Sequence, residues 1–362
     1  MKSYLDLVPQ YEKVHRKQSK MSRICIILAV FLVAVMFGLA DMYLQGITQK
    51  VMQENGDWHY QITSIDTKTS DLIAARPEVE VSGWHSTISA DAGYSISGQP
   101  IAISGLDEDV FGEIYLASLA EGKYPNAANE IAVSSVLKES NDLDLGSVID
   151  LTCPDGSTVS FSIVGFFDNP EKARLIVGSE QSVILAQEGF TTFISASNSP
   201  ASEKYIIQLS QHCDMSSTIE KIKSQYSLSD GQIEANMNLL NIEGQLAGKT
   251  GVNQIYSIAL ILSIIVMLTC ILMISSTLNS NVTQRTEFFG MLRCLGATKK
   301  QIMNFVRLEG LYWCKTAIPA GVALSIVVVW VTSAAMRKIS PQWFAYMPTW
   351  GISWISIAVS VL

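Results

Sequence analysis

The sequence lacks the patterns on which most metal and hydrolase sites depend. Its 362 residues include only 6 Cys and 4 His, with no Cys-x-x-Cys and no paired-His spacing, so no zinc site is predicted. No Gly-x-Ser-x-Gly sequence is present. Within residues 48–249 the histidines are isolated from one another: His59, His85 and His212. A membrane-anchored extracellular enzyme is therefore disfavoured, and no metal or cofactor is expected.

A phosphate-binding loop of the usual spacing is also missing. The segment from Gly244 to Thr250 resembles one, but three residues separate Gly244 from Gly248, whereas the nucleotide loop has four. No strand pattern precedes this segment, and an uncharged apolar run follows it. The chain is therefore not expected to hydrolyse ATP itself.

Charge is absent from several long stretches and uneven elsewhere. Residues 41–249 hold 29 Asp/Glu and 11 Lys/Arg, a net charge of −18, whereas the remainder holds 4 Asp/Glu and 14 Lys/Arg. Lys and Arg near a membrane span stay in the cytoplasm. The pattern therefore predicts a multi-pass protein of the plasma membrane, with a cytoplasmic N-terminus and a large acidic domain outside. Topology accounts for the basic segments, so the bilayer is an expected partner and nucleic acid is not.

The apolar runs divide the chain into eight segments. We predict a cytoplasmic N-terminal segment over 1–23, a first transmembrane helix over 24–47, an extracytoplasmic domain over 48–249, a second transmembrane helix over 250–284, a cytoplasmic elbow over 285–310, a third transmembrane helix over 311–336, a short outer loop over 337–349 and the start of a fourth transmembrane helix over 350–362. An uncleaved first span is favoured over a signal peptide, because the charged head is long and no small-residue cleavage site follows. The fourth run is too short to cross a bilayer of about 30 Å, so we expect a longer protein.

Residues 48–249 mix strand and helix patterns, which predicts an α+β domain inserted into the membrane α-helical bundle. Strands are expected over 58–65, 79–88, 100–104, 147–151 and 205–209, and helices over 69–76 and 215–226. Asp155-Gly156 predicts a hairpin turn between residues 148–153 and 158–164.

Two features of this domain leave alternatives open. Cys153 and Cys213 are its only cysteines; they either form a single disulfide or remain free thiols. The cluster of Asp107, Glu108 and Asp109 is interpreted as a solvated turn, with a calcium or catalytic role as the less favoured alternative.

The basic loop after the second apolar run has the pattern of a helical elbow. Gly296 is expected to stop the first helix, because glycine accepts a left-handed conformation. Thr298 then caps the next helix, with Gln301 at the capping-box position. A plain interfacial loop that anchors the bundle is the alternative interpretation.

Residues of this loop resemble the cytoplasmic signature of FtsX/MacB-type ABC transporter permeases. They are Arg285, Glu287, Gly290, Leu292-Arg293, Leu295-Gly296-Ala297-Thr298, Gln301-Ile302 and Glu309. Residues 119–125, 129–134, 145–146 and 161–165 are similar, in order, to motifs of the MacB-like extracytoplasmic domain. With one span before that domain and the others after it, the resemblance covers nearly the whole chain.

The resemblance implies a permease subunit that works with a separate cytoplasmic ATPase and with a second permease subunit or repeat half. It implies that ATP-driven motion is passed to the outer domain, for export or extraction of a hydrophobic or peptide-like substrate. Carried over by position, the ATPase contact consists of Arg285, Glu287, Phe288, Phe289, Gly290, Leu292, Arg293, Gly296 and Ala297. Some relatives instead sense antimicrobial peptides or regulate a cell-wall hydrolase without transport, which is the alternative function.

Overall fold

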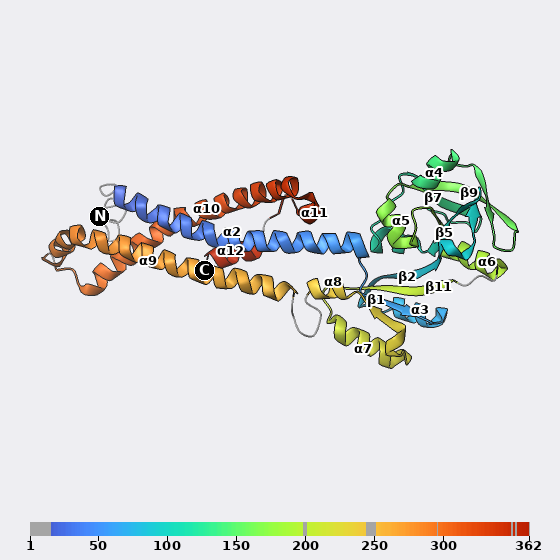
Figure 1. The fold of residues 1–362 in the computed structure, drawn as a ribbon. Helices are drawn as coiled ribbons and strands as arrows, with labels where there is room; N and C mark the ends of the chain where they lie inside the picture. Colours follow the sequence, from blue (N-terminus) through green and yellow to red (C-terminus); the bar gives the residue numbers. More distant parts are fainter. Residues whose placement is uncertain are drawn as a thin grey trace. The chain divides into compact units, whose positions relative to one another are not determined.

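The computed structural model describes residues 16–197, 201–243, 251–294, 296–348, 350–351 and 353–361 (Figure 1). The chain forms two compact units, one of Met1–Ile47 with Gly251–Leu362 and the other of Thr48–Thr250. The segment 244–250, which carries the phosphate-loop look-alike, lies outside the described residues.

The first unit is helical. It contains α2 (Arg16–Asn55) as far as Ile47, together with α9 (Gly251–Cys294), α10 (Lys299–Ile339), α11 (Pro341–Phe344) and α12 (Trp354–Val361). Among the described residues, three helical stretches are long and apolar enough to cross a membrane: Lys20–Asn55, Ile255–Met273 and Lys299–Ile339. Helix α2 continues past the span predicted to end at residue 47, because residues 48–55 are rich in helix-forming Gln, Lys, Met and Glu.

Small side chains let α10 approach α2 within this unit. A Cβ added at Gly321 would lie 2.9 Å from Cβ of Val30. Helix α12 also contacts α2, because the Ser356 hydroxyl donates to the Ala34 carbonyl at 2.5 Å. Close backbone approach and hydroxyl-to-carbonyl bonds are the usual means by which helices associate in a bilayer.

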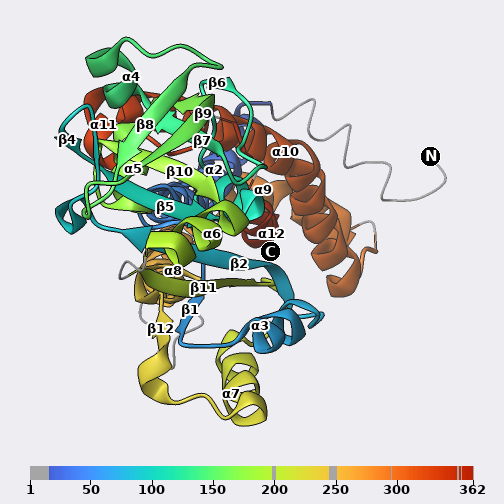
Figure 2. The same ribbon diagram turned by 90° about the vertical axis from the view of Figure 1, so that its right-hand side faces the viewer.

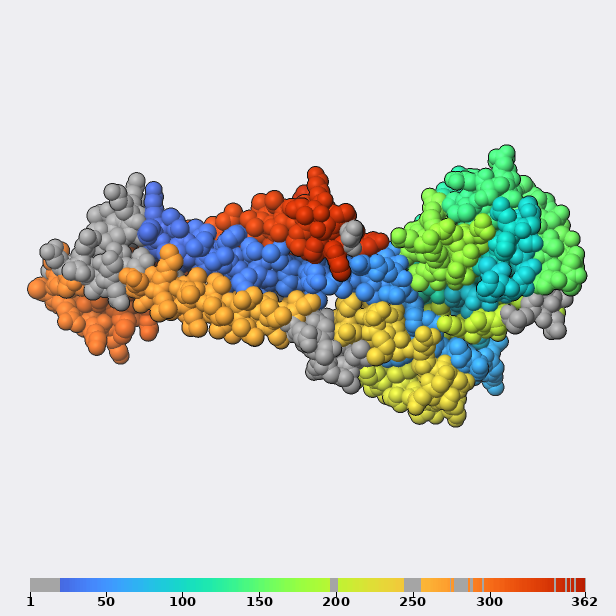
Figure 3. All heavy atoms as spheres, viewed as in Figure 1, coloured from blue at the N-terminus to red at the C-terminus, as the bar shows by residue number. Residues whose placement is uncertain are grey.

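Much of α9 remains apolar and exposed on the face shown in Figure 3, where it is drawn in orange. The exposed side chains include Ile258, Leu260, Ile261, Leu262, Ile264, Ile265, Leu268, Ile271 and Leu272. Exposure of these side chains to water is unfavourable, whereas contact with lipid or with a second membrane helix removes them from water.

The second unit is built on one mixed sheet of 12 strands. The strands are β1 (Tyr60–Thr63), β2 (Val79–Ile88), β3 (Ser95–Ile96), β4 (Gln99–Pro100), β5 (Ala102–Leu106), β6 (Glu121–Gly122), β7 (Glu130–Ser134), β8 (Val148–Thr152), β9 (Thr158–Phe167), β10 (Ser182–Ala186), β11 (Ser202–Leu209) and β12 (Ile233–Ala235). Their order is β12-β1-β11-β2-β5-β10-β7-β9-β8-β3-β4, with β6 paired to β9.

Helices pack against this sheet along its length, with α5 and α6 on the middle strands (Figure 2). They are α3 (Thr67–Ala74), α4 (Ser135–Asn141), α5 (Pro170–Val177), α6 (Gln187–Ser197), α7 (Met215–Tyr226) and α8 (Met237–Ile242). Beside β1 and β11, α3 and α7 close a core through Ile73, Ile219 and Ile222. Two further cores lie on β5, β7, β9 and β10, so the unit is the predicted α+β domain.

Elements with strong local signals form where the sequence predicts them. Strand β2 and helix α7 have the predicted bounds, and the β8–β9 hairpin turns at Asp155-Gly156. The strand predicted over 100–104 is instead split into β4 and β5. The chain changes partners there, because β4 pairs with β3 whereas β5 pairs with β2 and β10.

The disulfide alternative for the outer domain is wrong in this structure. Cys153 and Cys213 are both free. Cys153 is buried in the core that contains Phe161 and Ile163, whereas Cys213 packs against the core under α7. Because the two thiols belong to different cores of the sheet, they cannot meet without disrupting both.

The acidic cluster at residues 107–109 includes one half-buried carboxylate, Asp107, whereas Glu108 and Asp109 are exposed. The Asp107 carboxylate accepts a hydrogen bond from the Trp84 amide at 2.8 Å, and burial raises its pKa above the usual range. No group of three or more His, Cys, Asp or Glu suited to a metal is present in the part of the chain that the structure describes.

Candidate functional site

The elbow between α9 and α10 is closed by a helix-terminating turn at Gly296. The Gly296 amide donates to the Arg293 carbonyl at 3.0 Å, and the Ala297 amide donates to the Leu292 carbonyl at 3.0 Å. These two bonds form a Schellman motif, which requires a left-handed residue. Gly296 has φ of +92°, so the predicted helix stop is confirmed.

Helix α10 begins immediately after this turn with a capping box. The Thr298 amide donates to Oε1 of Gln301 at 2.8 Å, and the Gln301 amide donates to Oγ1 of Thr298 at 3.4 Å. The predicted cap is therefore confirmed. The two bonds satisfy backbone donors at the helix start and fix the direction in which α10 leaves the elbow.

A groove of about 420 Å³ lies against this turn, on the first part of α10. Its residues are Arg293, Lys299, Ile302, Met303, Val306 and Arg307. Three of these residues are apolar, namely Ile302, Met303 and Val306, and the other three are basic. The spacing of three and four residues places these α10 side chains on one helix face.

The predicted ATPase-contact residues are only partly assembled at this groove. Of them, Arg293 lines it. Gly290 is exposed on α9, Phe289 and Leu292 are half-buried, and Ala297 lies in the turn. For Arg285, Glu287 and Phe288 the backbone belongs to α9, but their side chains lie outside the described residues.

Sequence reasoning missed the α10 half of the groove. The signal was present: Lys299, Met303, Val306 and Arg307 follow the cap at helical spacing. Glu309, which belongs to the sequence signature, is 1% exposed and faces the interior of the helical unit instead.

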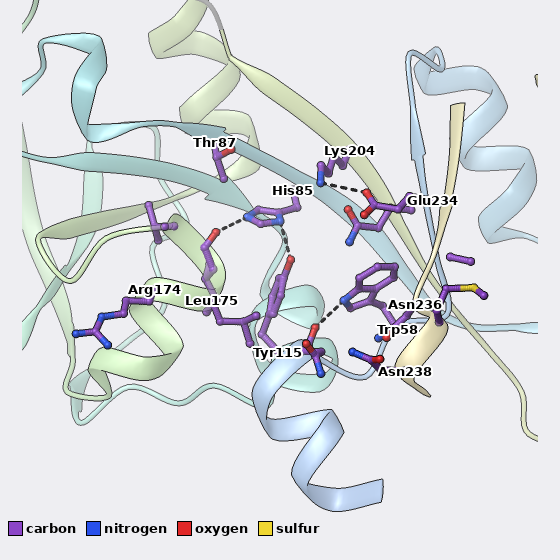
Figure 4. Close-up of a pocket in the computed structure, with 17 residues that line it drawn as sticks. Trp58, His85, Thr87, Tyr115, Arg174, Leu175, Lys204, Glu234, Asn236 and Asn238 are labelled. Atoms are coloured by element: carbon purple, nitrogen blue, oxygen red, sulfur yellow. Dashed lines mark hydrogen bonds and ion pairs between the residues drawn. The ribbon is translucent and has the colours of Figure 1, made fainter. Parts of the chain in front are cut away.

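A second cavity, of about 550 Å³, lies within the outer unit (Figure 4). Strand register assembles one of its walls. Gln61 of β1 lies opposite Glu234 of β12, and Lys204 of β11 lies opposite His85 of β2. Because alternate residues of a strand face the same side, these four side chains share one face of the sheet. The last turn of α5 and the start of α8 complete the lining.

His85 is a neutral structural residue of this cavity. Its Nε2–H donates to the Ile176 carbonyl at 2.9 Å, and the Tyr115 hydroxyl donates to its Nδ1 at 2.7 Å, as Figure 4 shows. Burial lowers the pKa of His85 to about 4, so the ring carries no charge near neutral pH. With both nitrogens occupied, His85 positions Tyr115 rather than acting on a ligand.

His59, which directly precedes β1, has a comparable structural role. Its Nδ1 accepts from the Leu209 amide at 2.8 Å, so Nε2–H donates to the Glu243 carboxylate at 3.0 Å. The imidazole ties β11 to the residue that follows α8. Neither His59 nor His85 is placed for catalysis.

Two protein families match this chain, one over its N-terminal part and one over its C-terminal part. The family described as MacB-like periplasmic core domain matches residues 22–225, more than half of the chain, and the family described as FtsX-like permease C-terminal matches residues 260–362. A search of curated proteins gave no match.

Two solved structures resemble the outer unit at low similarity. The periplasmic region of MacB from Actinobacillus actinomycetemcomitans is 8% identical with a TM-score of 0.39, over 56% of this chain and 100% of that one. The extracellular domain of the ABC-type transporter YknZ from Gram-positive bacteria is 8% identical with a TM-score of 0.35, over 49% and 98%. The family matches carry the assignment: the chain belongs to the FtsX/MacB-type permeases, which are permease components of ABC transporters rather than their ATPases.

Proposed function

We propose that this permease couples ATP hydrolysis by a separate cytoplasmic ATPase to movement of its extracytoplasmic domain, and thereby exports or extracts a hydrophobic or peptide-like substrate. The observation that carries the proposal is the groove at the elbow. It joins exposed apolar side chains to a basic rim, at a turn whose geometry is held by Gly296 and the Thr298 cap.

The chemistry of the groove fits a protein partner. Met303 is 47% exposed and Val306 is 38% exposed. Neighbouring exposed apolar side chains of this kind commonly mark a surface that another protein covers. Arg293, Lys299 and Arg307 would attract a partner segment that carries apolar anchors between acidic residues. In this proposal the ATPase supplies that segment, and Arg285, Glu287, Phe288, Phe289, Gly290 and Leu292 extend the contact along α9.

The path from the elbow to the outer domain runs through the membrane helices. We place the N-terminus and the elbow in the cytoplasm, because the basic residues flank the apolar runs on that side. Helix α2 is continuous from Arg16 to Asn55, so its apolar segment and the turn that enters the outer unit belong to one helix. A second permease subunit or repeat half would cover the exposed apolar side of α9.

The alternative function is peptide sensing or hydrolase regulation without transport. The net charge of −18 over residues 41–249 favours a cationic peptide ligand for this alternative. Transport and sensing separate in reconstituted vesicles: ATP-dependent movement of a peptide across the bilayer supports export, whereas peptide-stimulated ATPase activity without movement supports sensing.

Variants of the groove test ATPase docking. Membranes that express the full chain are solubilised, and the co-purified ATPase and its activity are measured. Arg293→Glu and Met303→Asp should each lower both by roughly tenfold or more, as expected for central interface residues. Lys300→Glu is the matched control, because Lys300 is exposed on the same helix turn but does not line the groove. Undiminished ATPase recovery with both groove variants would refute the docking site.

A further inference from the structure

The cavity of the outer unit contains a buried hydrogen-bond acceptor without a partner. Gln61 is 7% exposed and lines the cavity. Its Oε1 is buried and has no hydrogen-bond partner among the described residues. Buried polar atoms in folded proteins are nearly always paired, so an unpaired oxygen on a side chain that lines a cavity indicates a place for a donor from outside the chain.

The walls around Gln61 are held in place before any ligand binds. Trp58 is fixed because its Nε1–H donates to the Asn55 carbonyl at 2.7 Å. Tyr115 is fixed by its bond to His85, and Figure 4 shows both aromatic residues on the cavity lining. A preformed cavity loses little freedom on binding, and its volume lies within the range of roughly 300–1,000 Å³ typical of small-molecule sites.

The charges at the cavity come in opposite pairs. Nζ of Lys204 on β11 lies 3.6 Å from Oε2 of Glu234 on β12, with β1 between the two strands. The two side chains are 36% and 66% exposed. Arg174, also on the lining, is paired with Glu180. Each of the two basic side chains on the lining is therefore paired with a carboxylate, which does not favour a phosphate or a multiply charged cation.

Part of the remaining lining is apolar and adaptable, whereas Thr87, Asn236 and Asn238 add polar groups. Leu175 and Ile176 come from the end of α5, and Met237, which is 57% exposed, comes from the start of α8. A flexible Met side chain adjusts to different apolar groups. The cavity thus combines one unpaired acceptor with aromatic, aliphatic and amide-bearing side chains.

From these contacts we infer that the cavity binds a short peptide, with a backbone N–H donated to Gln61 Oε1 and an apolar side chain against Trp58 and Leu175. The Lys204 ammonium would donate to the C-terminal carboxylate or a carbonyl of the same peptide. The Glu234 carboxylate would accept from its N-terminal ammonium or an amide. The inference rests on the proposed function for its choice of cargo class, but it does not depend on ATPase docking.

Peptide retention by the full chain tests the site. The protein is placed in lipid nanodiscs without ATP and incubated with a synthetic library of random tripeptides, and retained peptides are identified by mass spectrometry after filtration. The best-retained tripeptide is then titrated calorimetrically. Gln61→Leu should weaken its binding by about tenfold or more, because the N–H would lose its acceptor. Thr87→Trp should abolish binding by filling the cavity while leaving Gln61 in place.

Gln99→Leu is the matched control. Gln99 Oε1 also lacks a partner among the described residues, but Gln99 does not line the cavity, so this variant should bind as the unchanged protein does. The inference is overturned if the unchanged protein retains no tripeptide, or if folded Gln61→Leu and Thr87→Trp proteins retain the same peptides equally well. Because no ATPase is present, failure here is distinct from failure of the docking proposal.

Discussion

Lys172 donates a hydrogen bond from its Nζ to the backbone carbonyl of Gln53 at 2.9 Å. Gln53 lies in the last turn of α2, where backbone carbonyls have no partner within the helix. A second bond runs from the same ammonium to the Tyr115 carbonyl at 2.6 Å. A cation at the C-terminal end of a helix is stabilising. Through this side chain, α5 holds the end of α2 against the sheet of the outer unit.

Lys172→Met should therefore destabilise the outer unit by about 1–3 kcal/mol, because both carbonyls lose their donor in a buried place. Lys172 is 6% exposed, so water does not readily replace the ammonium. Thermal unfolding followed by circular dichroism measures the change. Lys221→Met, at an exposed position of α7, should leave the transition where it is. An unchanged transition in Lys172→Met would show that this link carries no stability.

The neutral, buried His85 predicts a loss of stability in acid. Its folded-state pKa of about 4 lies below the ordinary value of 6.5, so between these two pH values the unfolded chain binds more protons. Stability contributed by the neutral ring is complete above pH 6.5 and decreases as pH falls toward 4. The loss is at most about 3–4 kcal/mol, since one pKa unit corresponds to about 1.36 kcal/mol.

Denaturant unfolding at several pH values measures this dependence. His85→Gln should lower stability at neutral pH and should flatten the pH dependence between 6.5 and 4. Equal slopes for the variant and the unchanged protein would assign the acid sensitivity to other groups.

Gly296→Ala should disturb the elbow through the backbone alone. No atom lies within 4 Å of an added Cβ, so the cost of roughly 1–2 kcal/mol comes from the left-handed φ of +92°. We expect weaker recovery of the ATPase with this variant. Gly310→Ala is the control, because Gly310 is also open to space but lies within α10 at an ordinary helical φ. Equal ATPase recovery from both variants would argue against a role for the turn.

Gly321→Val should separate α10 from α2. The added Cβ would meet Val30 Cβ at 2.9 Å and the Ile27 carbonyl at 3.0 Å, and the carbonyl belongs to backbone that cannot rotate away. Overpacking of this kind costs roughly 1–3 kcal/mol. The melting temperature in detergent should fall, whereas Gly310→Val, whose Cβ meets no atom within 4 Å, should have a smaller effect. Equal melting temperatures would contradict close packing at Gly321.

Features encoded by neighbouring residues could be predicted from the sequence. The apolar runs determine the candidate spans, since crossing a bilayer needs only length and hydrophobicity. The turn at Gly296, the cap at Thr298 and the hairpin at Asp155-Gly156 depend on conformational preferences within a few residues. The −18 charge between basic flanks likewise determined the expected topology.

Features that depend on distant pairing were decided by the tertiary structure. Gln61 and Glu234 face one cavity because β1 and β12 pair in one register, and His85 joins them through β2 and β11. Cys153 and Cys213 stay apart because they pack in different cores. A shift of one residue in strand register would turn Gln61, Glu234 and His85 to the opposite face. Local sequence therefore determined the helices and turns, whereas the non-local hydrogen bonds of the sheet determined which side chains share the cavity.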